Sequence, residues 1–574
     1  MNRPFKHLNK YFWQYRRPFI LGVVFVGLAN IFAVYQAVYV REAFNSLADG
    51  SAAANIWLFT GIIFGTAIIR GVFMYMMRQS LIVMSRNIEY DLKNEIYAQY
   101  QKLDFAFYKT HYTGDLMNRI SEDVGRVRMY VGPAIMYLVN MLTMFVVVIS
   151  SMFTVNAELA LYVLAPLPIL SISVYFINNT INKRSDRLQS KLSDLSTFVQ
   201  ETFSGLRVVK AFAKQGAMAN SFEKEAHDYR NRSLSLAMVD ALWFPLMLLL
   251  VGLSSIFTVY IGGLKVMEGT IGPGTIAEFI IYITMLTFPV AMLGWLTSTT
   301  QRAAASQVRI NEFLHTIPII QNPEPDANFA FETDVEFKNV SFAYPDKTYN
   351  ALSDISFKLT QGKSLGILGH TGSGKTTICQ LLLRLTDPTH GHIYIDGKPL
   401  NKINLDSYRQ TVGYVPQDVF LFSDTLRNNI AFGKEKLDDL VIIQAAKEAA
   451  LYDTIEAMPE GFETLIGERG ITLSGGQKQR LSIARALAMD PKLLVFDDCL
   501  SAVDTQTEKQ IIDGLKSAVK GKIALIVSHR PSGIMHCDEI LVLENGSVIE
   551  RGNHRSLVEM GGRYAKMLED LTFE

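Results

Sequence analysis

Long apolar stretches occupy the first half of the chain and end near residue 300. Six of them contain few charged residues, and each is close to or longer than the roughly 20 residues that a helix needs to cross a bilayer. They cover residues 18–40, 54–77, 129–153, 158–178, 236–262 and 271–297. The pattern predicts an all-α membrane domain with six spanning helices over residues 1–314.

Basic residues between these stretches predict the orientation of the spans. Residues 78–128 hold eight Lys and Arg residues and residues 183–232 hold ten, whereas the connections on the other side carry only Arg41 and Lys265. Because connections rich in Lys and Arg stay in the cytoplasm, we expect residues 78–128, residues 183–232 and both termini on that side.

The two long segments space their apolar residues three and four apart, which predicts that the spanning helices continue beyond the bilayer and turn back there. Stretches near residues 107–124 and 204–215 would form the tips. We expect these tips to dock onto another domain, because loops of this length without a function are uncommon. Solvated loops are the alternative.

The pattern changes beyond the last span. Residues 315–333 contain three prolines and predict a linker. Over residues 334–574, short β-type stretches alternate with helical patterns, which is typical of an α/β domain. The expected fold is therefore a six-span all-α membrane domain followed by an α/β domain.

Composition and charge narrow the class of protein. Hydrophobic residues make up 49% of the chain and charged residues 19%, which excludes a disordered protein and fits a chain partly in lipid. The 55 basic and 55 acidic residues cancel, so charge predicts no nucleic-acid partner. Cys379, Cys499 and Cys537 lack the spacing of a zinc site or a disulfide framework, which fits a reducing compartment.

The most specific motif is GHTGSGKTT, which follows an apolar strand pattern and precedes a helical one. Its glycines let backbone N–H groups surround a β-phosphate, while Lys375 meets the β- and γ-phosphates and Thr376 can ligate Mg²⁺. The predicted nucleotide-binding residues are Gly369, Thr371, Gly372, Ser373, Gly374, Lys375, Thr376 and Thr377.

A second apolar strand pattern, LLVFDD, ends in Asp497 and Asp498. A strand that ends in Asp beside a phosphate loop supplies a Mg²⁺ ligand, and Asp497 has that position. Asp498 stands where a carboxylate could polarise the attacking water. Either acid could instead cap a helix.

Between these two motifs lies LSGGQ, formed by Leu473, Ser474, Gly475, Gly476 and Gln477. A Ser and two Gly directly before a helix form another helix start that can bind an anion. The phosphate loop, LSGGQ and LLVFDD, in this order, resemble the nucleotide-binding domain of an ABC transporter. With six preceding spans, the whole chain resembles a bacterial ABC exporter half-transporter.

The resemblance implies that two nucleotide-binding domains dimerise head to tail, so that each ATP lies between one phosphate loop and the partner's LSGGQ. Tyr344 matches the aromatic residue that stacks on adenine, Gln417 the glutamine that contacts Mg²⁺ and water, and His529 the histidine that reaches the γ-phosphate. Residues 464–470 resemble the segment that touches the inner loops of exporters. The loop that crosses the dimer is matched by Ser501, Ala502, Val503 and Asp504.

The implied cofactors are ATP and Mg²⁺. The implied metal ligands are Thr376, Gln417 and Asp497, and the implied catalytic residues are Asp498, His529 and Gln417. The stretches around residues 107–124 and 204–215 resemble the cytoplasmic segments by which exporter spans contact the nucleotide-binding domains.

One position departs from the family pattern, because the usual Asp-Glu pair is replaced by Asp497-Asp498. The shorter side chain retracts its carboxylate by roughly 1.5 Å, and a misplacement on the order of 1 Å can lower a rate by about 10²-fold. ATP should bind while hydrolysis is slow. Many bacterial multidrug exporters are heterodimers with one such site, so the resemblance implies a different partner chain that carries Asp-Glu. A homodimer in which Asp498 is the base is the alternative.

The substrate expected from the family is a hydrophobic drug or a lipid-like amphiphile, moved across the bacterial cytoplasmic membrane. A lipid flippase subunit and a regulatory ATP-binding subunit are the alternatives. Arg70, Asp240 and Glu278 are charged residues within spans, which suggests a function, although positions near the membrane surfaces could also explain them. Several aromatic residues could line an apolar cavity: Tyr35, Tyr39, Phe73, Tyr282, Phe288 and Trp295.

Overall fold

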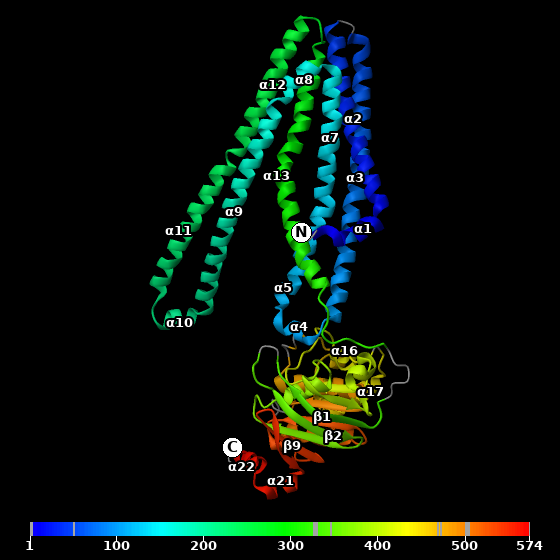
Figure 1. The fold of residues 1–574 in the computed structure, drawn as a ribbon, viewed down its shortest axis with the longest axis vertical. Coiled ribbons are helices and arrows are strands. Elements are labelled where there is room, and N and C mark those ends of the chain that lie inside the picture. The colour runs from blue at the N-terminus through cyan, green and yellow to red at the C-terminus, as the bar shows by residue number, and fades with distance from the viewer. Residues whose placement is uncertain are drawn as a thin grey trace. The chain divides into compact units, whose positions relative to one another are not determined.

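The computed structural model describes residues 4–49, 52–324, 331–344, 347–434, 436–467, 470, 473–499 and 505–572. It divides into two compact units (Figure 1). The first comprises Met1–Lys102 and Tyr112–Thr316, and the second comprises Leu103–His111 and Ile317–Glu574.

The first unit is built of long helices. Its described part contains six helical spans that are long and apolar enough to cross a membrane, at the six places that the apolar pattern predicts. The long helices are α2 (Arg16–Ala48), α3 (Ala52–Lys102), α7 (Ile135–Val155), α8 (Ala157–Leu164), α9 (Pro166–Ser204), α11 (Gln215–Asp240), α12 (Trp243–Met267) and α13 (Gly274–Leu314). Short helical segments complete the unit: η1 (Pro4–Leu8), α1 (Asn9–Gln14), α5 (Thr113–Asn118), η2 (Arg119–Asp123), α6 (Val124–Met129), η3 (Tyr130–Ala134) and α10 (Leu206–Ala211).

The predicted polar extensions of the spans are helical. In Figure 1, α9 and α11 run side by side and α10 joins their far ends. Lys191 of α9 contacts the carboxylates of Glu225 and Asp228 on α11, and Arg184 donates to the Ser235 hydroxyl at 2.8 Å. Polar contacts between these two helices thus replace the apolar packing found within the spans.

Two of the three charged span residues have partners within the first unit. Glu278 is fully buried, and its carboxylate accepts from Arg41 at 3.1 Å and from the Tyr282 hydroxyl at 2.8 Å. Arg70 donates to the amide oxygen of Gln36 at 3.2 Å. These contacts join α13 and α3 to α2.

The second unit contains two sheets, as expected of an α/β domain. One has the strand order β2-β1-β4-β5 and is antiparallel; the other has the order β10-β9-β3-β8-β7-β6 and is parallel except for the β9–β10 pair. The strands are β1 (Asp334–Phe342), β2 (Leu352–Thr360), β3 (Ser364–Gly369), β4 (His390–Ile395), β5 (Lys398–Pro399), β6 (Val412–Val415), β7 (Leu493–Asp497), β8 (Ile523–Ser528), β9 (Glu539–Glu544) and β10 (Ser547–Gly552).

The α-helices of this unit are α4 (Phe105–Thr110), α14 (Lys375–Leu382), α15 (Leu405–Arg409), α16 (Leu426–Ala431), α17 (Asp439–Glu448), α18 (Tyr452–Glu456), α19 (Gly475–Ala488), α20 (Thr505–Ala518), α21 (His554–Met560) and α22 (Arg563–Thr572). Short turns of other helix types are η4 (Leu400–Lys402), η5 (Gly461–Glu463) and η7 (Pro531–Gly533).

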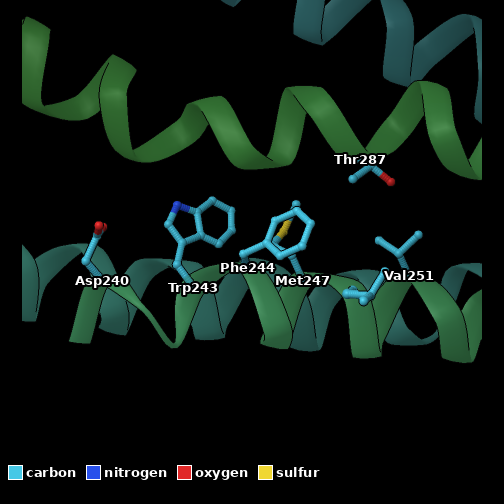
Figure 2. Close-up of a pocket in the computed structure, with 7 residues that line it drawn as sticks. Asp240, Trp243, Phe244, Met247, Val251 and Thr287 are labelled. Atoms are coloured by element: carbon cyan, nitrogen blue, oxygen red, sulfur yellow. The ribbon is translucent and has the colours of Figure 1, made fainter. Parts of the chain in front are cut away.

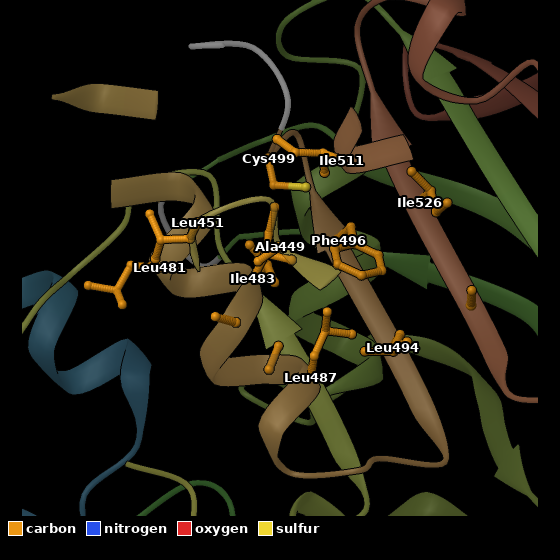
Figure 3. Packing of buried hydrophobic residues seen from close by; sticks show 14 of the residues in the cluster. Ala449, Leu451, Leu481, Ile483, Leu487, Leu494, Phe496, Cys499, Ile511 and Ile526 are labelled. Atoms are coloured by element: carbon orange, nitrogen blue, oxygen red, sulfur yellow. The ribbon is translucent and has the colours of Figure 1, made fainter. Parts of the chain in front are cut away.

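Strand β7 lies between two apolar cores. Leu494 and Phe496 point to the core that α19 covers (Figure 3), whereas Leu493 and Val495 belong to the core on the other face. Successive side chains of a strand point to opposite faces, so a strand buried on both faces is a continuous apolar run. This burial explains the sequence LLVF and fixes the end of the strand, where Asp497 is the last residue of β7 and Asp498 follows it.

Candidate nucleotide-binding site

The predicted phosphate loop joins β3 to the start of α14. Gly372 and Gly374 have φ angles of +86° and +102°, which L side chains rarely adopt. A Cβ atom at Gly374 would also lie 2.6 Å from the carbonyl oxygen of Ala351. The two glycines therefore permit the turn that presents backbone N–H groups at the first turn of α14.

Lys375 is the first residue of α14. Its Nζ donates to the carbonyl oxygens of Gly369 at 2.7 Å and His370 at 2.8 Å. Burial lowers the pKa of Lys375, and the nearby carboxylates of Asp498 and Asp497 oppose that shift. The ammonium thus lies over the loop, beside the two acids.

Asp497 ends β7 directly beside α14. The Thr376 hydroxyl donates to its Oδ1 at 3.2 Å, while its Oδ2 is buried with no hydrogen-bond partner in the described part of the chain. Burial raises the pKa of Asp497 to about 6; the Thr376 hydrogen bond opposes this shift and the charge of Asp498 adds to it. The Oγ of Ser373 is likewise buried and unpaired among the described residues.

Asp498 contacts the other two predicted catalytic residues, His529 and Gln417. Its Oδ1 lies 2.7 Å from His529 Nδ1, and its Oδ2 accepts from the Gln417 amide at 3.3 Å. Both atoms of the Asp498–His529 contact are thus within hydrogen-bond distance. These residues follow β7, β8 and β6, whose carboxyl ends meet at one edge of the parallel sheet.

The backbone of Asp498 is in the left-handed region, with φ of +51°. This conformation is unfavourable for a residue with a Cβ atom by roughly 1–2 kcal/mol. The amide of Asp498 donates to the Val527 carbonyl at 2.9 Å, and its side chain is mostly buried. Backbone and side-chain contacts together hold the carboxylate in place.

Tyr344 lies after β1. Its hydroxyl is 3.1 Å from the Thr377 hydroxyl and donates to Gln380 at 3.3 Å, and the Lys109 ammonium of α4 lies 4.7 Å from the ring centroid. Sequence reasoning missed Lys109, which precedes Tyr344 by more than 200 residues. The only sequence signal was the expectation that residues 107–124 dock onto another domain.

One cavity of about 570 Å³ brings together most of the predicted site. Its described lining contains Tyr344, Thr371, Gly372, Gly374, Lys375, Thr376, Thr377, Gln417, Asp497, Asp498 and His529, together with Lys347, Tyr349, Asn350, Ala351, Asn545 and Gly546. The last six were not predicted, and they belong to no motif that would have indicated them.

Of the LSGGQ residues, Ser474 caps α19 and Gly475, Gly476 and Gln477 form its first turn, and none of the five lines this cavity in the described structure. The Ser474 hydroxyl accepts from the Gln477 amide at 3.3 Å, and the Gln477 side chain accepts from the Ser474 amide at 2.9 Å. This reciprocal cap fixes the first turn of the helix. The predicted crossing loop, Ser501 to Asp504, lies outside the described residues, as do Glu468 and Arg469 of the 464–470 segment.

Two family models match the chain. "ABC transporter transmembrane region" matches residues 19–290, and "ABC transporter" matches residues 352–501. Relatives are similar over nearly the whole chain. A probable multidrug resistance ABC transporter ATP-binding/permease protein, YheI of Bacillus subtilis (strain 168), is 34% identical and covers 98% of this chain and 97% of its own length. An ATP-dependent lipid A-core flippase of Syntrophus aciditrophicus (strain SB) is 31% identical and covers 98% of this chain and 94% of its own length.

Among solved structures, a bacterial Atm1-family ABC exporter with ATP bound superposes with a TM-score of 0.79 at 26% identity. The alignment covers 97% of this chain and 98% of that one. The chain therefore belongs to the bacterial ABC exporters, transporters that hydrolyse ATP and combine a transmembrane domain with a nucleotide-binding domain.

Proposed function

We propose that this chain exports hydrophobic or amphiphilic compounds across the bacterial cytoplasmic membrane, and that its partner in the dimer is a different half-transporter. The observation that carries the proposal is the pair Asp497-Asp498 at the end of β7, in a site that otherwise keeps its expected residues. The basic loops support cytoplasmic N- and C-termini.

In this proposal the chain's own site binds ATP. The amides of the phosphate loop, with Gly369, Thr371, Ser373 and Thr377 around them, surround the phosphates, and Lys375 neutralises their charge. Tyr344 stacks on adenine, and His529 reaches the γ-phosphate. The shared cavity supports these roles because it places the aromatic ring, the ammonium and the imidazole around one space.

The residues at the end of β7 fit a Mg²⁺ ion. A buried carboxylate oxygen without a hydrogen bond, Oδ2 of Asp497, calls for a cation, and oxygen donors suit Mg²⁺. Thr376, Asp497 and Gln417 would hold the ion. When bound, Mg²⁺ neutralises charge on the transferring phosphoryl group.

Hydrolysis at this site is proposed to be slow. The Asp498 carboxylate is roughly one C–C bond shorter in reach than a Glu carboxylate, and its two oxygens face His529 and Gln417. A general base must lie within hydrogen-bond reach of the water that it activates. Loss of that reach leaves ATP binding intact and lowers the hydrolytic rate.

The partner's site is proposed to be the competent one. Leu473, Ser474, Gly475, Gly476 and Gln477 are intact, and the cap between Ser474 and Gln477 leaves the Gly475 and Gly476 amides for a phosphate. Ser501, Ala502, Val503 and Asp504 would cross to the partner. The partner supplies the phosphate loop and the Glu of that second site.

The relatives support two substrate classes. The relative YheI is named as a multidrug resistance transporter, and this favours export of drug-like amphiphiles by the present chain. The lipid A-core flippase relative covers the chain equally well, so a lipid flippase subunit is the second candidate. ATPase activity that drugs stimulate in a fixed lipid mixture favours the exporter, whereas stimulation by a lipid alone favours the flippase.

The composition of the native complex tests the heterodimer. The tagged chain is extracted gently from its own membranes, and the complex is weighed and its subunits identified. A second half-transporter that carries Asp-Glu is the expected result. A complex of two copies of this 64.4 kDa chain and nothing else would overturn the heterodimer and make Asp498 the base.

A further inference from the structure

The fifth span is interrupted where it continues into the polar helix α11. Helix α11 ends at Asp240, and α12 begins at Trp243. Pro245, in the first turn of α12, has no N–H to donate to the carbonyl of Ala241, so the helix breaks there. In a membrane, backbone groups freed in this way are tolerated where protein or a polar cavity surrounds them.

A cavity of about 480 Å³ lies beside this break. Figure 2 shows Asp240 at the end of helix α11, and Trp243 and Phe244 at the start of helix α12, pointing toward helix α13, from which Thr287 points back. The volume is within the range of roughly 300–1,000 Å³ found for sites of drug-sized ligands. The remaining lining residues are Met247, Leu248 and Val251.

Asp240 differs from the other charged residues of the spans. Glu278 is paired with Arg41, and Arg70 donates to Gln36. The Asp240 carboxylate is exposed, and no ion pair or hydrogen bond engages it in the part of the chain that the structure describes. A carboxylate without a partner at the end of an apolar groove is poorly matched to a lipid tail or an apolar helix, because neither would offset its charge.

The aromatic side chains next to Asp240 suit the same kind of ligand. Phe244 is 75% exposed, and the indole of Trp243 is half-buried against the groove. The face of an aromatic ring attracts cations, and that of Trp does so most strongly. A carboxylate with two adjacent aromatic rings thus offers a charge contact and π-faces to one ligand.

We propose that this groove binds amphiphilic organic monocations, with Asp240 opposite the cationic centre and Trp243 and Phe244 against its apolar groups. The proposal rests on the proposed function, since it names the substrate class of that exporter. Met247 and Val251 extend the apolar wall, and this favours ligands whose charge lies at or near an apolar body.

The test uses the assembled transporter in nanodiscs and two probes of nearly the same shape and opposite charge, tetraphenylphosphonium and tetraphenylborate. Saturable binding is measured by equilibrium dialysis, with empty nanodiscs as the blank. We expect the wild type to bind the cation and Asp240→Asn to bind it about tenfold more weakly, the factor that accompanies loss of one modest charge contact. Asp240→Glu should keep the affinity, and Trp243→Ala should lower it more than Trp243→Phe.

Asp186→Asn is the matched control, because Asp186 is an exposed carboxylate on α9 with the same charge to remove. Its affinity for the cation should equal that of the wild type. Equal cation affinity in the wild type and Asp240→Asn overturns the proposal, as does failure of the wild type to bind the cation, which is the result expected if a partner helix fills the groove. Equal binding of both probes identifies a lipid-like occupant and also overturns it.

Transport assays separate this site from the proposed function. ATP-driven uptake of neutral amphiphiles that Asp240→Asn leaves unchanged would keep the exporter function, whatever happens to the cation site. Saturable cation binding that depends on Asp240, without ATP-driven movement of any amphiphile, would support the site and overturn the export function.

Discussion

The Nδ1 atom of His529 lies 2.7 Å from Oδ1 of Asp498, and the Gln417 amide donates to the other carboxylate oxygen at 3.3 Å. The acid that should activate water is thus held between residues that follow β8 and β6, the strands on either side of β7. Its carboxylate ends roughly 1.5 Å short of the reach of a Glu. This difference in reach gives the first prediction.

Asp498→Glu should restore hydrolysis at the chain's own site. The change is measured as ATP turnover in an assembled transporter whose partner has lost its own catalytic Glu, so that only this site reports. We expect turnover to rise by about 10²-fold, the effect that misplacement on the order of 1 Å has on a rate.

Asp498→Asn is the companion variant in a transporter with an intact partner. It should leave most of the ATPase activity, whereas removal of the partner's Glu should abolish it. A loss with Asp498→Asn as complete as that with the partner variant would show that Asp498 is the base.

Lys375→Met should weaken ATP binding by about 10- to 100-fold. Its ammonium lies over the phosphate loop, and hydrogen bonds to charged groups contribute about 1.5–3 kcal/mol. Binding of a fluorescent ATP analogue measures the loss. Lys363→Met, which removes an exposed ammonium paired with Asp538, is the control and should bind as the wild type does. Equal loss in both variants would contradict a phosphate contact by Lys375.

Asp396 should make the stability of the second unit depend on pH. Its carboxylate accepts from the backbone amides of Glu332, Thr333 and Asp334, each at 2.7 Å. Although burial opposes the shift, these bonds and the Thr333 hydroxyl lower the pKa of Asp396 below its usual value. A carboxyl group with a lowered folded-state pKa stabilises the fold above its unfolded pKa of about 3.9, and this contribution is lost as the pH falls through the folded value.

Asp396→Asn is the matched variant, because Asn tolerates the φ of +48° found at this position. At pH 7 it should cost about 1–3 kcal/mol, from lost hydrogen bonds to a charged group. The difference from the wild type, followed by thermal unfolding of the full chain, should shrink below pH 4. A difference that stays constant from pH 7 to pH 3 would rule out an ionised Asp396 as its cause.

Glu278→Gln should destabilise the first unit without changing substrate affinity. The variant leaves Arg41 beside a neutral amide, and breaking a buried pair by removing one partner costs about 3–5 kcal/mol. Thermal unfolding in detergent measures the loss. Glu42→Gln is the control, since the partly exposed Glu42 also contacts Arg41 and should contribute about 0–1 kcal/mol. Unchanged stability with lost substrate binding would instead give Glu278 a role in the transport path.

The spans and the phosphate loop could be predicted because their signals are local. A run of about 20 apolar residues has few alternatives to a spanning helix, and the glycines at 372 and 374 mark a turn within nine residues of sequence. The buried strand LLVF could also be predicted, because both of its faces lie in apolar cores and its sequence is therefore a continuous apolar run.

Contacts between distant residues could not be predicted in this way. Arg41 and Glu278 are 237 positions apart, and only the packing of α2 on α13 brings them together. The positive φ of Asp498 has no sequence signal either, since the contacts that hold it come from the ends of other strands. The groove at Asp240 could not be predicted either, because it is formed by the helix break together with Thr287 on the facing side of α13.

Helix α4 belongs to the second unit, although the chain reaches it between the second and third spans. Its Lys109 lies over the ring of Tyr344, one of the walls of the nucleotide cavity. A soluble fragment that begins after the linker would therefore be an incomplete copy of this unit, with the Tyr344 ring uncovered. Supplying α4 through a designed connection would cover the Tyr344 ring again.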